Sequence, residues 1–239
     1  MKKLLIAGAA LAALIGTPAL AADLALKAPP PPVAPMYSWA GFYLGVEGGG
    51  GWAKSRQTDT FGATTGDYNQ SGGLAGGTIG YNWQWSNIVG GLEADMSWAG
   101  INGSVNLPLA CTNGGGTACF TNMHWLNTDR ARLGVLVGAQ NQFLLYITGG
   151  LAGAEIRSGQ SPCALPFAAF GQVASCGTKT EWAGVGGAGV EAMIAPHWSA
   201  KLEYLYTNFG THTFYTVFIP VNVKESNVNI VRAGVNWHF

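Results

Sequence analysis

The residues whose types and spacing most clearly suggest a chemical reaction are a histidine and a serine two positions apart, His197 and Ser199. A histidine beside a serine hydroxyl can act as a general base and create a nucleophile for acyl hydrolysis. Such a site also needs a carboxylate that orients the histidine, and the sequence identifies none for this pair. The other histidines, His124, His212 and His238, are predicted to lie at surfaces or interfaces. We therefore do not expect an enzyme.

Cysteines offer a second kind of chemistry. The four of them form two local pairs, Cys111 with Cys119 and Cys163 with Cys176. In a chain that carries an export signal, such pairs are more typical of disulfides than of catalysis or metal binding. Three connectivities are possible, and this one is favoured because each of its two disulfides closes a short loop. No histidine and cysteine cluster has the spacing of a zinc site, so neither a metal nor a cofactor is expected.

Charged residues offer a third kind, because several of them alternate with apolar residues along extended segments. On an extended strand, neighbouring side chains point to opposite faces, so these charges share the face opposite the apolar residues. Gathered in one interior, they would form a network of paired charges. The predicted members are Glu47, Glu93, Asp95, Arg130, Arg132, Glu191, Lys201, Glu203 and Arg232.

Eight alternating segments must position these charges. Short turns and long connections follow one another between the segments, as in barrels that cross a membrane, and a closed barrel leaves no unpaired sheet edge. The sequence thus predicts an all-β, eight-stranded antiparallel up-and-down transmembrane β-barrel, with apolar residues outside and polar residues inside. The predicted strands are Trp39–Gly50, Gly72–Gln84, Ile88–Ala99, Trp125–Gly138, Gln142–Ala154, Thr180–Ile194, Trp198–Phe209 and Val228–Phe239.

Tryptophans support this arrangement because they gather at the ends of the predicted strands. Two such groups are typical of the aromatic belts at the two surfaces of a membrane. At the short-turn ends lie Trp39, Trp83, Trp85, Trp198 and Trp237, and at the long-loop ends lie Trp52, Trp98, Trp125 and Trp182.

The amino terminus predicts export. Lys2 and Lys3 precede an apolar run, and Ala19-Leu20-Ala21 matches a cleavage site, so residues 1–21 are predicted to be a signal peptide. The alternative is an uncleaved membrane anchor, which the short apolar run disfavours. Residues 22–38 are then a proline-rich periplasmic segment, and residues 39–239 form the barrel, with both termini in the periplasm.

Composition excludes one class of partner. Hydrophobic residues make up 48% of the chain and charged residues only 10%. Without Lys2 and Lys3, 10 of the 12 basic residues remain against 12 acidic ones, and no basic run could follow a phosphate backbone. We therefore expect no nucleic-acid partner.

The opening Trp39-Ala40-Gly41-Phe42-Tyr43, the proline run 29–32 and the terminal Asn236-Trp237-His238-Phe239 carry a family resemblance. In these features the chain resembles the small OmpA-like outer-membrane barrels, and among them the surface-antigen or porin-family proteins of alphaproteobacteria. The resemblance implies an abundant structural component of the bacterial outer membrane. It also implies an assembly signal, read by the barrel-assembly machinery, at Val231, Val235, Trp237 and Phe239.

The interior decides between the expected functions. An eight-stranded barrel is narrow enough for side chains to fill, and buried charges persist when they are paired. A plugged barrel with a structural or envelope-integrity role is therefore favoured over a narrow porin-like channel for small solutes. A loop-based binding protein or adhesin is the other alternative. Outer-membrane lipid and lipopolysaccharide are expected partners, and a surface ligand could bind the loops.

The predicted long loops are the places for such recognition. The second covers residues 100–124 and the third residues 156–179, and each contains one of the proposed disulfides. The fourth contains the apolar stretch Phe214–Val223, which is unusual for a free loop. It is either an exposed patch for a partner or, as we prefer, a hairpin that continues the last two strands.

Overall fold

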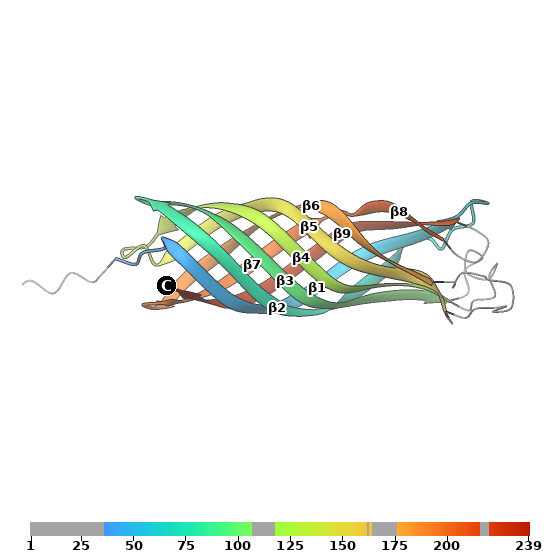
Figure 1. Cartoon of the computed structure of the whole chain (residues 1–239), viewed down its shortest axis with the longest axis horizontal. Helices are drawn as coiled ribbons and strands as arrows, with labels where there is room; N and C mark the ends of the chain where they lie inside the picture. The colour runs from blue at the N-terminus through green and yellow to red at the C-terminus, as the bar shows by residue number, and fades with distance from the viewer. Residues whose placement is uncertain (1–35, 107–117, 162, 164–175, 216–219) are drawn as a thin grey trace, which may run out of the picture. The chain divides into compact units, whose positions relative to one another are not determined.

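The computed structural model describes residues 36–106, 118–161, 163, 176–215 and 220–239. Each strand pairs antiparallel with its neighbour, and the last pairs with the first, so the sheet closes into a barrel (Figure 1). No described residue belongs to a helix long and apolar enough to cross a membrane. The strands are β1 (Gly41–Asp59), β2 (Tyr68–Trp85), β3 (Ile88–Asn106), β4 (Ala118–Val137), β5 (Phe143–Ser161), β6 (Cys176–Ala195), β7 (Trp198–Thr207), β8 (Gly210–Tyr215) and β9 (Pro220–His238).

The strands β7 and β8 together fill the seventh place in the wall. Both pair with β9, β7 along residues 228–237 and β8 along residues 220–225. The chain is interrupted between them at Asn208 and Phe209, and β8 begins at Gly210, whose φ of 83° is a backbone conformation that glycine adopts readily. The ring therefore has eight positions, as predicted.

The two ends of the barrel differ. At the terminal end lie Met36, Phe239 and the tight turns around Ser86, Asn141 and His197. At the loop end, the strands lead into the turn at residues 60–67 and into residues 107–117, 162–175 and 216–219.

The strands continue farther toward the loop end than the sequence predicted, so the expected second and third loops were too long. Residues 100–106 belong to β3, and residues 101–106 pair with residues 118–123 of β4. The strand β4 continues alongside β5 up to Ser161. The alternation persists there with its polarity exchanged: Ile101 and Met123 point inward, whereas Arg157 is exposed. The end of the outward apolar pattern is therefore not the end of the strand.

The outward face carries an apolar band bounded by aromatic residues. Trp83, Trp85 and Trp198 are exposed toward the terminal end, and Trp52, Trp98 and Trp182 toward the loop end. Between them the exposed side chains are mainly aliphatic, including Val46, Leu92, Leu133, Ile147 and Leu202. This is the surface expected of a barrel in lipid.

Trp39 does not belong to the aromatic belt at the terminal end, so its predicted outward position was wrong. The side chain is 0% exposed and lies inside the terminal end. Its backbone N–H donates to Gln84 Oε1 and its indole N–H donates to the carbonyl of Asn141, each at 2.8 Å. The indole N–H thus has a buried partner, which makes the inward position stable.

Candidate functional site inside the barrel

The nine predicted charged residues all point into the lumen, with 0–6% of their surface exposed. They project from β1, β3, β4, β6, β7 and β9, because each occupies the inward position of its strand. Because charged residues occupy inward positions on several strands, residues far apart in the sequence come together in one cluster.

Arg232 lies at the centre of the cluster. Its guanidinium donates to both carboxylate oxygens of Asp95, at 2.9 and 2.7 Å, and its Nε donates to Glu203 at 2.8 Å. It also pairs with Glu47. One cation from β9 therefore contacts three carboxylates, from β1, β3 and β7.

Arg130 and Lys201 connect these three carboxylates with a fourth, Glu93. Arg130 pairs with Glu203 at 2.8 Å and with Asp95 at 2.9 Å, and it also pairs with Glu93. Lys201 Nζ lies 3.1 Å from Glu47 and 3.2 Å from Glu93. Each of these four acids thus has at least two cationic neighbours, which is the condition under which buried charges persist.

Arg132 forms an arm of the network with Glu191. Its Nη1 lies 2.9 Å from Glu191, and its Nε donates to Asn82 Oδ1 at 2.9 Å. The guanidinium carbon lies 4.5 Å from the ring centroid of Tyr43 and 5.4 Å from that of Tyr146. This residue is therefore held by an ion pair and by two aromatic rings.

Two inward glycines make room for those rings. A Cβ atom on Gly80 would lie 2.2 Å from the Tyr43 hydroxyl, and one on Gly189 would lie 2.5 Å from the Tyr146 ring. The tyrosine hydroxyls donate to Glu93 at 2.8 Å and to Glu203 at 3.1 Å. A side chain at either glycine would displace a tyrosine from the network.

Apolar layers lie on both sides of the charges. Toward the terminal end, Trp39 packs in a buried cluster with Val89, Leu136, Leu144 and Met193. Toward the loop end, a larger buried cluster fills the interior. Its members include Leu74, Ile101, Met123, Leu126, Ile156, Val185, Leu205, Phe209, Phe214 and Ile230.

Polar residues also gather inside the barrel toward the loop end. Gln57 Nε2 donates to Ser158 Oγ at 2.9 Å and to the Tyr68 hydroxyl at 3.0 Å. Gln70 donates to Glu225 at 2.7 Å. Burial raises the pKa of Glu225 to about 7, although the hydrogen bond from Gln70 opposes that rise. These residues lie past the outer aromatic belt, since Glu225 pairs with Ser55, three residues beyond Trp52.

Ser199 does not pair with His197, the arrangement that acyl hydrolysis would need and that the sequence did not favour. Its hydroxyl instead lies 2.9 Å from His238 Nε2 and hydrogen-bonds Glu191. His197 Nδ1 contacts the backbone carbonyl of His238 at 2.9 Å. Ser199 is 0% exposed, and it contacts the acid directly, so the acid does not orient the histidine as a hydrolytic site requires.

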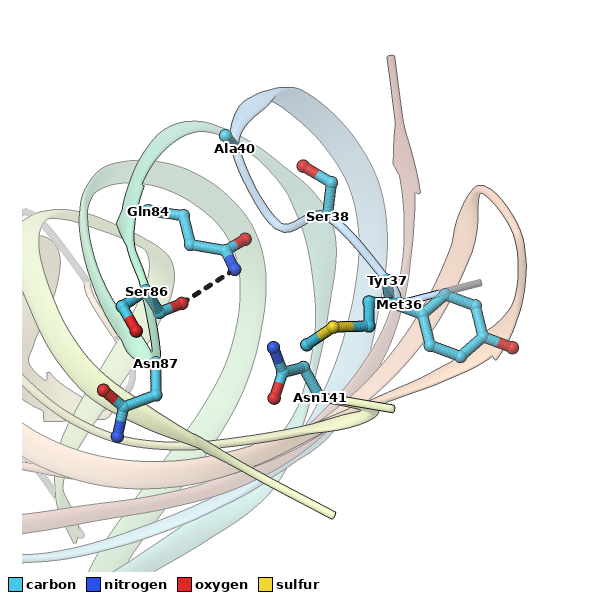
Figure 2. A pocket seen from close by; sticks show the side chains of 8 residues that line it. All are labelled: Met36, Tyr37, Ser38, Ala40, Gln84, Ser86, Asn87 and Asn141. Atoms are coloured by element: carbon cyan, nitrogen blue, oxygen red, sulfur yellow. Dashed lines mark hydrogen bonds between the residues drawn. The ribbon is translucent and has the colours of Figure 1, made fainter. Parts of the chain in front are cut away.

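The terminal end carries a hollow of about 530 Å³ at its surface (Figure 2). The backbone N–H of Tyr37 donates to the Gln140 carbonyl at 3.1 Å, which fixes the segment that precedes β1 against the turn after β4. The lining is neutral and rich in amides, and Gln84 donates to the carbonyl of Ser86 at 3.0 Å. Its residues are Met36, Tyr37, Ser38, Ala40, Gln84, Ser86, Asn87 and Asn141.

The loop end contains the disulfide Cys163–Cys176, with 5.6 Å between the Cα atoms. Cys119 is also disulfide-bonded, and Cys111 lies outside the described residues. Of the stretch Phe214–Val223, residues 214–215 belong to β8 and residues 220–223 to β9, and the two strands pair; residues 216–219 lie outside the described part of the chain. Phe214, Val221 and Val223 are buried. The hairpin interpretation of this stretch therefore agrees with the structure.

Several residues of the interior were not predicted. The charge pattern identified the nine charged members of the network, but Asn82, Asn236, Tyr43 and Tyr146 also contact them. All four lie at inward positions of predicted strands, so the alternation of inward and outward side chains could have identified them. Among the described residues, no group of three or more histidines, cysteines or carboxylates could hold a metal ion.

Comparisons with known proteins extend over almost the whole chain. Residues 7–239 match the family model of the outer membrane protein beta-barrel domain. The chain is 32% identical to the 31 kDa outer-membrane immunogenic protein of Brucella melitensis over 249 aligned residues, which cover 97% of this chain and 98% of that protein. It is 32% identical to the 22 kDa outer membrane protein of Rhizobium leguminosarum bv. viciae, over 87% of this chain and 82% of that one.

Among solved structures, the outer membrane protein OprG from Pseudomonas aeruginosa aligns with a TM-score of 0.57 at 16% identity. The alignment covers 86% of this chain and 100% of that one. At this identity the likeness concerns the fold alone.

Proposed function

The chain belongs to the outer-membrane β-barrel family, and from this premise we propose that it is a structural component of the outer membrane with a closed lumen. Its loop end faces the cell exterior and both termini lie in the periplasm. Its interior transmits no large solute. It has no enzymatic activity, and the residues at its loop end are available for surface interactions.

The observation that carries this proposal is the stacking of filled layers in the lumen. Trp39 and its apolar neighbours fill the terminal end, the ion-pair network fills the middle, and the second apolar cluster fills the part toward the loop end. Ion permeation would require Arg232 to leave Asp95 and Glu203, and also passage through two apolar layers. Both steps oppose conduction, because ions are poorly solvated by apolar side chains.

Conductance recordings test the closed lumen. Purified protein in a planar bilayer should give no reproducible porin-sized steps. The variant Trp39→Gly with Arg232→Gly, which removes parts of two layers, should raise the frequency of small current events. Large steps from the unchanged protein would contradict the proposal.

Orientation needs a separate test. Gly62 and Gly66 lie in the turn between β1 and β2, and a Cβ atom at either would have no neighbour within 4 Å. A short epitope inserted at this turn should therefore be tolerated, and antibodies should label it on intact cells. Labelling only after the outer membrane is permeabilised would contradict the proposed orientation.

A narrow channel is the second candidate. Arg132 Nη2, Asn82 Nδ2 and Asn236 Oδ1 are buried without a hydrogen-bond partner among the described residues. Groups of this kind commonly bind internal water, and connected waters could pass protons or small ions. Small pH-dependent currents that disappear in the variant Arg132→Met would favour this candidate.

Assembly and surface recognition complete the proposal. Val231, Val235 and Phe239 are exposed on the outward face of β9, and Trp237 is half-buried there. This arrangement supports the role of the four residues as the signal for the barrel-assembly machinery. The names of the Brucella relatives describe those proteins as immunogenic, which supports surface exposure of the loop end here.

A further inference from the structure

The basic residues of the barrel are unevenly distributed. Four of the nine in residues 36–239 lie in the lumen network. Lys179 donates to the Thr213 carbonyl and lies 5.3 Å from the Phe214 ring centroid, and Arg157 lies alone on β5. The remaining three, Lys54, Arg56 and Lys224, share one patch on the outward face of β1 and β9.

Strand pairing fixes the geometry of this patch. Arg56 stands directly opposite Lys224 in the β1–β9 ladder, and Lys54 is two residues from Arg56 on the same face. All three are exposed. Like charges at opposite positions of a ladder repel each other, so this arrangement is unfavourable unless an anion binds between them.

The chain itself supplies one negative charge next to these three cations. Asp67 lies 2.8 Å from Arg56, with about half of each side chain exposed (52% and 48%). The hydrogen bond from Arg56 lowers the pKa of the Asp67 carboxyl, with smaller contributions from Lys54 and Lys224. One carboxylate against three cations leaves two positive charges uncompensated, which leaves room for a further anionic group.

The position of the patch indicates where that anion comes from. Lys54 follows Trp52 by two residues on the same outward face, and Trp52 belongs to the aromatic belt at the loop end. Basic residues immediately beyond such a belt lie at the depth of lipid headgroups. Below the patch, Gly48 and Ala233 help to form a hollow of about 430 Å³ in the outer wall, where an acyl chain can pack.

We propose that Lys54, Arg56 and Lys224 bind the phosphate groups of an outer-leaflet glycolipid, the lipopolysaccharide, against the β1–β9 wall. This inference rests on the proposed orientation, in which the loop end faces the cell exterior. Arg56 is suited to bidentate phosphate contact, and the two lysines supply further charge. The seam that closes the barrel would thereby also be held by a bound lipid.

The test uses the full mature protein in mixed micelles. Its probes are lipid A with both phosphates, the same lipid without phosphates, and inorganic phosphate. Binding is measured by native mass spectrometry and titration. Phosphorylated lipid A should bind, and replacing Lys54, Arg56 and Lys224 together by glutamine should weaken binding on the order of a hundredfold, at about fivefold for each charge.

Two matched variants sharpen the test. Arg157→Gln removes an exposed basic residue on β5, away from the patch, and should leave the affinity unchanged. Asp67→Asn removes the internal competitor and should tighten binding by about threefold. Heat-modifiable migration on gels should show that every variant is folded.

Equal binding of lipid with and without phosphates, or unchanged binding by the triple variant, would overturn the proposal. Binding of inorganic phosphate as tight as that of the lipid would assign the patch to free phosphate and also overturn it. Because the assay uses micelles, its outcome does not depend on orientation. Failure of the orientation is seen separately, by epitope labelling at Gly62 on intact cells.

Discussion

Arg232 on β9 and Asp95 on β3 form a bidentate ion pair across the lumen, with donor–acceptor distances of 2.9 and 2.7 Å. Both side chains are fully buried. Paired hydrogen bonds of this kind are stronger and more directional than a single contact. Strands that are not neighbours in the barrel wall are therefore connected directly through its interior.

Removing one partner of this pair should be strongly destabilising. Arg232→Met leaves Glu47, Asp95 and Glu203 with one cation fewer, and breaking a buried pair in this way typically costs about 3–5 kcal/mol. Urea unfolding of the protein in lipid vesicles, followed by tryptophan fluorescence, would measure the loss. The control Arg157→Met, at an exposed site on β5, should change the free energy of unfolding by less than about 0.5 kcal/mol.

The double variant Arg232→Met with Asp95→Leu separates pairing from packing. Because it removes a cation and an anion together, it should recover part of the stability lost in Arg232→Met. A double variant that is less stable than Arg232→Met by the full effect of Asp95→Leu would show that the two residues act independently, contrary to the geometry.

The alternation of inward and outward side chains along each strand made most members of this network predictable. Glu93 and Asp95, or Arg130 and Arg132, are two residues apart, so an alternating strand places both members of each pair inside. The partners across the lumen could not be predicted in the same way. Whether Arg232 contacts Asp95 or Glu191 depends on the tilt and stagger of strands around the ring, and a single strand carries no information about either.

Other features were not predicted because they depart from the pattern of apolar residues outside the barrel and polar residues inside. The sequence pattern places Trp39 in the aromatic belt at the terminal end, but its buried hydrogen bond to Asn141 depends on a turn far along the chain. Beyond the outer belt, the polarity of the alternation is exchanged, with Ile101 inside and Arg157 outside. A prediction that requires every outward residue to be apolar therefore makes the strands too short.

Gly80 should tolerate no side chain, because a Cβ atom there would lie 2.2 Å from the Tyr43 hydroxyl and 2.7 Å from the Leu92 carbonyl. Gly80→Ala should therefore lower the free energy of unfolding by about 1–3 kcal/mol. Gly77, also on β2, is the matched control, since its Cβ atom would meet no atom closer than 3.6 Å. Equal stability of the two alanine variants in vesicles would contradict this packing.

Asp129 is a carboxylate on the outward face of β4. It is exposed, and it pairs with Ala94 on β3 and Leu151 on β5. It lies four residues from Trp125, roughly 13 Å along the strand, so it stands within the apolar band. The described residues provide no ion pair for it.

Asp129→Leu should raise the free energy of unfolding in vesicles by about 1–2 kcal/mol, because an acidic residue facing lipid is unfavourable. Asp129→Asn, which removes the charge but keeps the shape, should give a smaller gain. A loss of stability in Asp129→Leu, together with a change in oligomeric state on native gels, would indicate instead that the carboxylate contacts another membrane protein.

Glu225 should make the loop end sensitive to pH. Burial raises the pKa of Glu225 to about 7, above the value of about 4.3 expected in an unfolded chain. The folded protein therefore binds a proton that the unfolded chain releases between these two values. The stabilising effect is complete below pH of about 4.3 and is lost as the pH rises through about 7.

The measurement compares hydrogen exchange of the β1, β8 and β9 backbone near Glu225 at pH 5 and pH 8, with rates corrected for intrinsic exchange. Protection should fall at the higher pH, by an amount corresponding to on the order of 3 kcal/mol or less. Glu225→Gln, which is neutral throughout and can still accept the hydrogen bond from Gln70, should remove most of this dependence. If the variant retained the full dependence, another group would be responsible for the pH effect.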